Sequence, residues 1–478
     1  MSSLKRKILS GSLWTIIGQF ISLAISLLSN IWLARLLNPD DFGRFGIIMF
    51  FISIANVMVE GGLSAALIRK KEPTEKDYST VFFFNLFVSL SIFFIIFLFS
   101  GKISDYYNDS SLSLLLICSS IVIIFNAFQL VPSVKIIVDM RFREKAIYEF
   151  IATILSSFTG IILAQIGFGI WAIIFMNILK SLFLVIILNV YSFYRIQLIF
   201  SRSSFRSLFS FGFNTTISSM IIILFDNIYQ LILGKYFSLS QVGFYYQAKR
   251  LQDVLVNMFS LLSNGVFYSG LSKVQQDKSY FIYSYNNFVS VLMIILGLIT
   301  LFIYNFSYVI VTILYGSKWV EAGYYLQMLV VSSLFFIQES FNRIIFKIFN
   351  KTGLILKLEI IKKIFQSISI IIGVYYHNIM LLLIGLIISS GMGYFINSYI
   401  ARNVINDEKY NEVENFKKFC GILFIEIILI EVFKYYFDNL YSIFLFIIFI
   451  IPSFLIISGK MKILNFEQLL RDIKKIKK

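Results

Sequence analysis

The chain has 478 residues, of which 58% are hydrophobic and only 14% are charged, and its formal net charge is +16. Soluble domains carry about 25% charged residues, so this composition excludes an ordinary soluble protein and indicates one embedded in lipid. Apolar stretches of roughly 20 residues, each long enough to cross a hydrocarbon core as a helix, recur along the chain. Because open strands leave backbone groups unpaired in lipid, we expect an all-α polytopic membrane protein.

The apolar stretches predict fourteen transmembrane helices joined by short loops, with no room for a soluble domain. We expect these helices at residues 9–34, 42–68, 80–100, 112–133, 145–166, 169–191, 206–233, 242–270, 287–314, 321–348, 353–374, 379–402, 418–437 and 440–458. The resulting domains are a six-helix N-terminal bundle (1–200), a second six-helix bundle that repeats it (201–403), a cytoplasmic linker (404–417), two additional helices (418–459) and a basic cytoplasmic tail (460–478).

The two predicted bundles begin with similar segments that lie 200 residues apart. After the first helix, Arg35 is followed by two large apolar residues and then by Gly43; after the seventh, Lys235 and Gly243 occupy the corresponding positions. The flanking apolar stretches match in length and order. Internal duplications of this kind build many transporters, so we predict two pseudo-symmetric halves around a central path.

Lysine and arginine are distributed unevenly among the predicted loops. With the N-terminus in the cytoplasm, roughly 30 of these residues fall on the cytoplasmic side and 6 on the outer side. The positive-inside rule therefore places both termini in the cytoplasm. The net charge then reflects membrane orientation and anionic headgroups, and we expect no nucleic acid partner.

The sequence contains none of the usual enzyme motifs. There is no phosphate-binding glycine loop of the P-loop type, no CxxC pair and no catalytic arrangement that includes histidine. Cys118 and Cys420 lie in or beside apolar stretches, and the single histidine, His377, is insufficient for a His-based metal site. We expect no catalytic residues, no metal, no cofactor and a protein that is not an enzyme.

Polar side chains recur at helical spacing in the first, second, seventh and eighth predicted helices, so each series shares one face of its helix. The series are Thr15, Gln19, Ser22, Ser26 and Asn30; Ser53, Asn56, Glu60 and Ser64; Thr215, Ser219, Asp226 and Gln230; and Tyr246, Arg250, Asp253, Asn257, Ser260 and Asn264. Because facing lipid is costly, these faces line either a cavity or a contact between helices, and for the first helix both interpretations stand equally.

Ionisable residues within the helices favour the cavity. Glu60, Asp226, Arg250 and Asp253 lie well inside apolar stretches, where a charge costs roughly 2.5–3.5 kcal/mol unless it is paired or hydrated. Arg250 and Asp253 could instead form a structural pair at i, i+3. Lys180 lies near the middle of the sixth predicted helix, far from either interface.

Two other polar groups favour structural roles. Glu339 and Arg343 are spaced i, i+4 in the tenth predicted helix, as in an ion pair. Asn126 and Gln129 precede Pro132, which indicates a kinked helix end.

Three stretches carry a family resemblance: WLARLLNPDDFGRFG at 32–46, EGGLSAALIRK at 60–70 and GKYFSLSQVGFYYQAKRL at 234–251. In these the chain resembles Wzx-type polysaccharide flippases of the multidrug/oligosaccharidyl-lipid/polysaccharide exporter superfamily. The resemblance implies two bundles arranged as a V, with helices one, two, seven and eight lining a central cavity. It further implies a bacterial plasma (inner) membrane protein that moves polyprenyl-pyrophosphate-linked oligosaccharide to the outer leaflet by alternating access.

This resemblance, together with the polar faces, leads to hypothesised site residues. Pyrophosphate needs cations, for which Arg250 and Lys180 are the candidates. Candidate sugar contacts are Gln19, Asn30, Asn56, Tyr246, Asn257 and Gln230, and candidate residues for ion coupling are Glu60, Asp226 and Asp253. The expected partners are the lipid-linked oligosaccharide and membrane lipid, with a polysaccharide polymerase and a chain-length regulator as candidate protein partners.

Two alternative functions remain open. A multidrug or small-solute exporter of the same superfamily would share the repeat, although such exporters commonly have twelve helices. A membrane polysaccharide polymerase or ligase would need a sizeable outer loop for its catalytic groups, and no predicted outer loop here exceeds about 20 residues.

Overall fold

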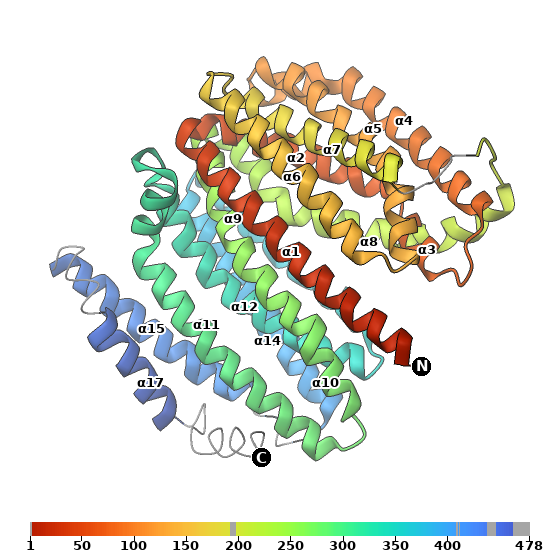
Figure 1. Cartoon of the computed structure of the whole chain (residues 1–478). Coiled ribbons are helices and arrows are strands. Elements are labelled where there is room, and N and C mark those ends of the chain that lie inside the picture. The colour runs from red at the N-terminus through yellow and green to blue at the C-terminus, as the bar shows by residue number, and fades with distance from the viewer. Residues whose placement is uncertain (1, 192–196, 408–409, 411, 437–445, 462–478) are drawn as a thin grey trace. The chain divides into compact units, whose positions relative to one another are not determined.

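The computed structural model describes residues 2–191, 197–407, 410, 412–436 and 446–461, and within these ranges the chain forms helices and no strand (Figure 1). The first eight helices are α1 Ser2–Leu36, α2 Pro39–Glu60, α3 Leu63–Arg69, α4 Glu75–Tyr107, α5 Ser111–Val138, α6 Phe142–Gln165, α7 Ile170–Tyr191 and α8 Arg202–Tyr236. Then follow α9 Leu239–Leu262, the π-helix η1 Ser263–Phe267, α10 Tyr268–Lys273, α11 Lys278–Tyr315, the 3-10 helix η2 Ser317–Trp319, α12 Ala322–Ile348, α13 Thr352–Tyr375, α14 Ile379–Ile405, α15 Glu412–Tyr436, the π-helix η3 Phe446–Ile450 and α17 Ile451–Lys460.

The predicted all-α polytopic fold is confirmed. Each of the fourteen predicted helices overlaps one or more observed helices, although part of the last, 440–458, lies outside the described residues. In the described part of the chain, ten helices are long and apolar enough to cross a membrane. The long helices α9, α13 and α15 do not reach that criterion because several charged residues interrupt their apolar sequence.

The second predicted helix, 42–68, is divided in the structure. Gly61 and Gly62 adopt the left-handed conformation, with φ of 53° and 62°, and they separate α2 from α3. Glycine adopts this conformation readily because it lacks a Cβ atom. The periodicity of the apolar residues continues across the break, which explains why the sequence predicts one helix.

The chain forms two compact units. Unit 1 comprises Met1–Tyr246 with Leu314–Trp319, and unit 2 comprises Gln247–Ile313 with Val320–Lys478. These units are defined by packing and not by sequence repetition. The predicted repeat boundary at 200/201 and the limits of the linker and tail therefore stay predictions.

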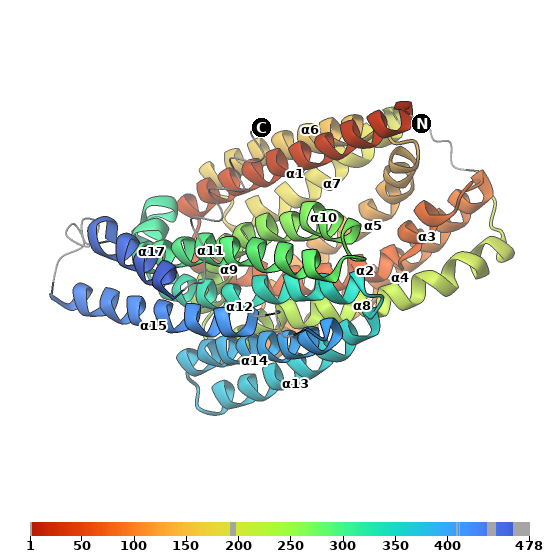
Figure 2. The same cartoon turned by 90° about the horizontal axis from the view of Figure 1, so that it is seen from below.

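In unit 1, α1 packs along α6, α6 along α7, and α5 against both α4 and α7 (Figures 1 and 2). Helix α8 lies along α2 and α3, and a small apolar core joins it to α3, α4 and α5. The members of that core include Leu63, Leu67, Phe82, Val131 and Leu208. Gly212 of α8 contacts the backbone at Gly61, where an added Cβ would lie 2.4 Å from the Gly61 carbonyl oxygen.

The repeat appears in unit 1 as a reciprocal contact between the first turns of α2 and α9. A Cβ on Gly43 would lie 2.1 Å from the carbonyl oxygen of Leu239, and a Cβ on Gly243 would lie 2.1 Å from that of Pro39. Ser240 donates a hydrogen bond to Asp40, and this pair also lies 200 positions apart. We call this contact the glycine crossing. It confirms the predicted pseudo-symmetry, since equivalent positions of the two halves meet each other.

The two cations of the repeated segments also act equivalently. Arg35 Nε donates to the carbonyl oxygen of Leu314, in the last turn of α11, at 2.9 Å. Lys235 Nζ donates to the carbonyl oxygen of Tyr106, in the last turn of α4, at 2.5 Å. The final carbonyl groups of a helix lack partners within it and carry partial negative charge, so a cation stabilises them.

Trp319 packs against the residues beside the two glycines of the glycine crossing. Its side chain is fully buried, its Nε1 donates to the Ala34 carbonyl oxygen at 2.7 Å, and its ring meets Phe42 and Phe244 edge-on. A buried indole N–H needs an acceptor, and the last turn of α1 supplies one.

In unit 2, the helix α12 is the most enclosed element and packs against α13 and α14 (Figure 2). The apolar core is rich in aromatic rings, with Phe341 on α12 and Phe416 and Phe419 on α15 all fully buried. Helices α15 and α17 lie side by side, and Phe419 and Phe454 occupy the space beside Gly297 of α11.

The glycine crossing predicts strong sensitivity to a single methyl group. Gly43→Ala or Gly243→Ala forces the facing backbone to move, which we expect to destabilise the protein by about 1–3 kcal/mol. Gly101→Ala is the matched control, because no atom lies within 4 Å of the position that its methyl group would occupy, and alanine stabilises an open helical site by roughly 0.5–1 kcal/mol. Thermal unfolding of the purified variants measures the difference, and equal melting temperatures for G43A and G101A would contradict the close contact.

Candidate functional site

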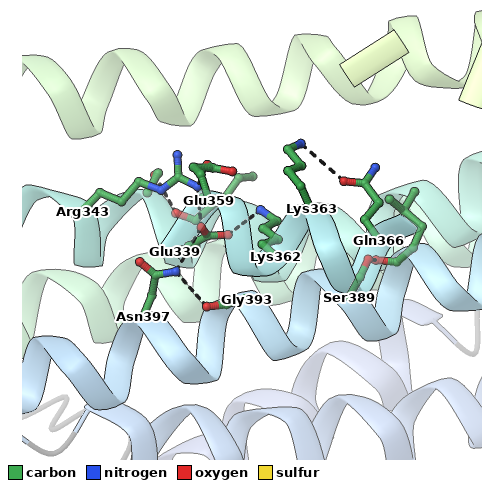
Figure 3. Close-up of polar contacts among 12 residues, drawn as sticks. Glu339, Arg343, Glu359, Lys362, Lys363, Gln366, Ser389, Gly393 and Asn397 are labelled. Atoms are coloured by element: carbon green, nitrogen blue, oxygen red, sulfur yellow. Dashed lines mark hydrogen bonds and ion pairs between the residues drawn. The ribbon is translucent and has the colours of Figure 1, made fainter. Parts of the chain in front are cut away.

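A cluster of four charged side chains lies inside unit 2 (Figure 3). Glu339 on α12 accepts from Lys362 Nζ on α13 at 2.6 Å and also pairs with Arg343 one turn along α12. Arg343 pairs in turn with Glu359 of α13, and Asn397 of α14 donates to Glu339 at 3.2 Å. We call Glu339, Arg343, Glu359 and Lys362 the buried ionic cluster.

The buried ionic cluster supplies the opposite charges and hydrogen bonds that charged side chains need when they are removed from water. Its two carboxylates and two cations cancel, and the Glu339 side chain, only 1% exposed, receives donors from three helices. Lys362 also lies over the Phe336 ring, and Gly393 leaves room for its stem, since a Cβ there would lie 2.9 Å from Lys362 Cδ. Buried ion pairs persist only when such partners compensate the cost of removing them from water.

The predicted pair of Glu339 and Arg343 is therefore confirmed, but it belongs to a larger set. Glu359 and Lys362 are not among the site residues predicted from the sequence. Their signal was available: they are spaced i, i+3 within the apolar stretch 353–374, so they share a face of α13. Nothing along the chain indicated that this face meets Glu339.

A network of amide side chains lies in unit 1. Asn126 on α5 donates to Asn56 on α2 at 2.7 Å and accepts from Ser181 on α7 at 3.3 Å and from Gln129. Asn56, predicted to contact sugar, is therefore part of a contact between three helices. The predicted helix end at Pro132 is wrong, because α5 continues through that proline to Val138.

Two predicted site residues of unit 1 are buried in similar environments. Asn30 on α1 and Gln230 on α8 lie 200 positions apart and are 3% and 5% exposed. In both, the side-chain carbonyl oxygen is buried and has no hydrogen-bond partner among the described residues. Buried polar atoms are nearly always paired, so acceptors left open at two equivalent positions are available to water or to a ligand.

The remaining predicted residues of unit 1 lie in different environments. Glu60, Lys180 and Asp226 are exposed, as is Gln19 of α1, so each can reach lipid, water or a ligand. Tyr246 is half-buried, and its ring packs against Phe42 and Phe45 at the glycine crossing.

In unit 2, the predicted residues lie along α9. Asp253 pairs with Lys249 at i, i+4. Arg250 is half-buried and Asn257 is exposed. All of these site assignments stay predictions. In the described part of the chain, no group of three or more His, Cys, Asp or Glu residues could hold a metal ion.

Comparison with known proteins identifies the family. The model of the family described as "Polysaccharide biosynthesis protein" matches residues 32–323. The chain belongs to this family. Among curated relatives, it is 21% identical to the succinoglycan biosynthesis transport protein ExoT of Rhizobium meliloti over 67% of this chain and 65% of that protein. It is 24% identical to the lipopolysaccharide biosynthesis protein WzxC of Escherichia coli over 70% and 68%, so the matches span about two thirds of each relative.

Solved structures show the same fold. The lipid II flippase MurJ in an inward closed conformation aligns with a TM-score of 0.71 at 16% identity, covering 96% of this chain and all of that one. A multidrug resistance transporter of the MATE family, facing inward, aligns with a TM-score of 0.59 at 17% identity, covering 82% and 98%. The family match confirms the predicted polysaccharide family, these alignments show that the chain has the fold of such transporters, and the protein is a multi-pass membrane protein.

The buried ionic cluster predicts unequal effects for the same substitution at two lysines. Lys362→Met removes the main cationic partner of Glu339, and breaking a buried pair costs about 3–5 kcal/mol. Lys418→Met breaks an exposed pair with Glu414, whose side chain is 70% exposed, and such pairs contribute at most about 1 kcal/mol.

Thermal unfolding of both variants measures this difference. Adding Glu339→Gln to Lys362→Met should recover part of the loss, because the carboxylate that lost its partner is then neutral. A double variant as unstable as the sum of its single changes would show that the two groups do not act as a pair.

Proposed function

We propose that this protein is a flippase for lipid-linked oligosaccharides. It moves polyprenyl-pyrophosphate-linked repeat units from the cytoplasmic to the outer leaflet of the bacterial plasma membrane. The units then serve the synthesis of a surface polysaccharide such as O antigen, capsule or exopolysaccharide. Both termini lie in the cytoplasm, and the protein acts by alternating access and not as an enzyme.

One observation carries this proposal: a chain of the polysaccharide biosynthesis family has, over 96% of its length, the fold of a lipid II flippase. The relatives named for succinoglycan and lipopolysaccharide biosynthesis share a connection to glycan synthesis. Each such glycan is a large polar molecule that must reach the far side of a membrane.

The glycine crossing supports alternating access. It joins equivalent positions of the two halves through backbone atoms and one side-chain hydrogen bond. A contact of this kind allows small rotations while it holds its centre in place, as expected of a pivot between halves. The apolar prenyl chain can remain in lipid while only the polar headgroup enters the path.

The hypothesised contacts follow from the chemistry of the headgroup. Arg250 and Lys180 would bind pyrophosphate, because cations are its strongest partners. Asn30 and Gln230 have buried side-chain carbonyl oxygens that can accept hydrogen bonds from sugar hydroxyls. The other proposed sugar contacts are Gln19, Asn56, Tyr246 and Asn257, and the proposed carboxylates for ion coupling are Glu60, Asp226 and Asp253. A polysaccharide polymerase and a chain-length regulator remain the candidate protein partners.

A drug or small-solute exporter is the second candidate, favoured by the alignment with the MATE transporter. Deleting the gene and locating the lipid-linked oligosaccharide separates the candidates. Single repeat units trapped on the cytoplasmic leaflet, with surface polymer lost, would support the flippase. Units that reach the outer leaflet unpolymerised would indicate a polymerase, and unchanged glycans would indicate an exporter.

The anion contacts yield a direct prediction. Arg250→Gln and Lys180→Gln should each reduce flipping by roughly tenfold or more, because a hydrogen bond to a charged group contributes about 1.5–3 kcal/mol. Matched controls are Arg402→Gln and Lys102→Gln, which remove exposed cations elsewhere. The measurement is surface polymer restored in the deletion strain at equal expression. Normal polymer in both R250Q and K180Q would show that these cations do not hold the pyrophosphate.

A further inference from the structure

Unit 2 contains another buried glutamate, Glu412. Its carboxyl group contacts hydroxyl groups, whereas that of Glu339 contacts cations. Glu412, the first residue of α15, is 2% exposed. Its oxygens accept from three hydroxyl groups: Tyr394 at 2.8 Å, Ser398 at 2.5 Å and Tyr410 at 2.7 Å. Within the described residues no lysine or arginine pairs with it.

The three hydroxyl groups come from α14 and from the segment before α15, so Glu412 joins these two parts of the chain. Tyr394 and Ser398 lie one turn apart on α14, and Tyr410 lies in the segment before α15. Tyr410 also reaches Asn342 Oδ1 of α12 at 3.0 Å, and Tyr285 of α11 donates to the same oxygen at 2.7 Å. We call Glu412, Tyr285, Asn342, Tyr394, Ser398 and Tyr410 the hydroxyl cluster.

The cluster contains one acidic group and no compensating charge among the described residues. The titratable groups that face Glu412 are the phenols of Tyr285 from α11, Tyr394 from α14 and Tyr410 from the preceding segment. Phenols stay neutral at physiological pH. Helix α12 contributes the neutral Asn342, and the buried ionic cluster on the same helix has charges that cancel. Burial raises the pKa of the Glu412 carboxyl, and the hydrogen bonds from Ser398, Tyr410 and Tyr394 offset that rise only in part.

We propose that Glu412 is a proton-binding site: its neutral acid holds α11, α12, α14 and α15 together, and loss of the proton loosens this joint. The step is the simple release of one proton from the carboxylic acid to water, which leaves a carboxylate without a charged partner. If the protein is the flippase proposed above, this proton is a candidate for the ion that drives its cycle.

Infrared spectroscopy of the purified full-length protein in lipid nanodiscs tests the site directly. The carbonyl stretch of a protonated carboxyl should persist well above the ordinary pKa of glutamate, about 4.3, and part of it should disappear in Glu412→Gln. Glu426, also buried and bonded to Ser453, contributes its own signal, so the difference between wild type and E412Q isolates Glu412. Glu414→Gln, at an exposed site on the same helix, is the matched control and should change nothing in this region.

Stability should follow the same titration. A raised pKa in the folded state means that the contribution to stability is full at low pH and is lost as pH rises through the folded pKa. Wild type and E414Q should therefore lose melting temperature over that range. E412Q should lose less of it, because glutamine imitates the neutral acid and removes the titration at this position. Ser398→Ala removes a donor to the carboxylate, so it should move the midpoint to higher pH.

These results decide the two parts of the proposal separately. An infrared spectrum in which E412Q removes no carbonyl signal, or an S398A midpoint equal to that of wild type, overturns the proton site. If E412Q folds and loses the signal but flips normally, the proton site stands and its coupling role is wrong. If wild type itself does not flip oligosaccharide, the proposed function fails while the spectroscopic result is unaffected.

Discussion

Two glycines placed 200 residues apart allow the backbones of α2 and α9 to touch, and this contact joins equivalent positions of the repeat. Neither position has room for a Cβ atom, because a carbonyl oxygen of the opposite helix lies 2.1 Å from where it would be. Arg35 and Lys235 form a second equivalent pair of contacts, because each donates to a carbonyl oxygen in the last turn of a helix, α11 and α4 respectively. Because the two halves have similar sequences, a contact that the first half makes with the second is matched by an equivalent contact in the reverse direction.

The second constraint is the cost of polar groups away from water. The structure meets it in three ways: the buried ionic cluster cancels its charges, the Asn126 network pairs amides, and the hydroxyl cluster surrounds one carboxyl with hydroxyl donors. Some buried polar atoms have no hydrogen-bond partner among the described residues, and the side-chain oxygens of Asn30 and Gln230 are two of them, at equivalent positions of the repeat.

Two glutamates of unit 2 show how surroundings decide chemistry. Glu339 has two cations within reach and is held as a carboxylate, whereas Glu412 has three hydroxyl groups and favours a proton. Both are buried glutamates near apolar sequence, and their spacing along the chain does not distinguish them. The sequence assigns Glu412 only to a linker, because other acidic residues surround it there.

The sequence by itself determined the class of fold, the helices, the repeat and the family, because hydropathy, charge and duplication are properties of consecutive residues. It also led to Asn30 and Gln230 through their spacing on helix faces. It did not separate α2 from α3, since the two left-handed glycines interrupt the backbone without interrupting the apolar pattern. The sequence also led to the pairing of Glu339 with Arg343, but the partners of Glu339 on α13 and α14, and those of Asn56 and Glu412, came only from the tertiary structure. A buried charge is stabilised by the groups that other helices bring to it, and those groups lie far away along the chain.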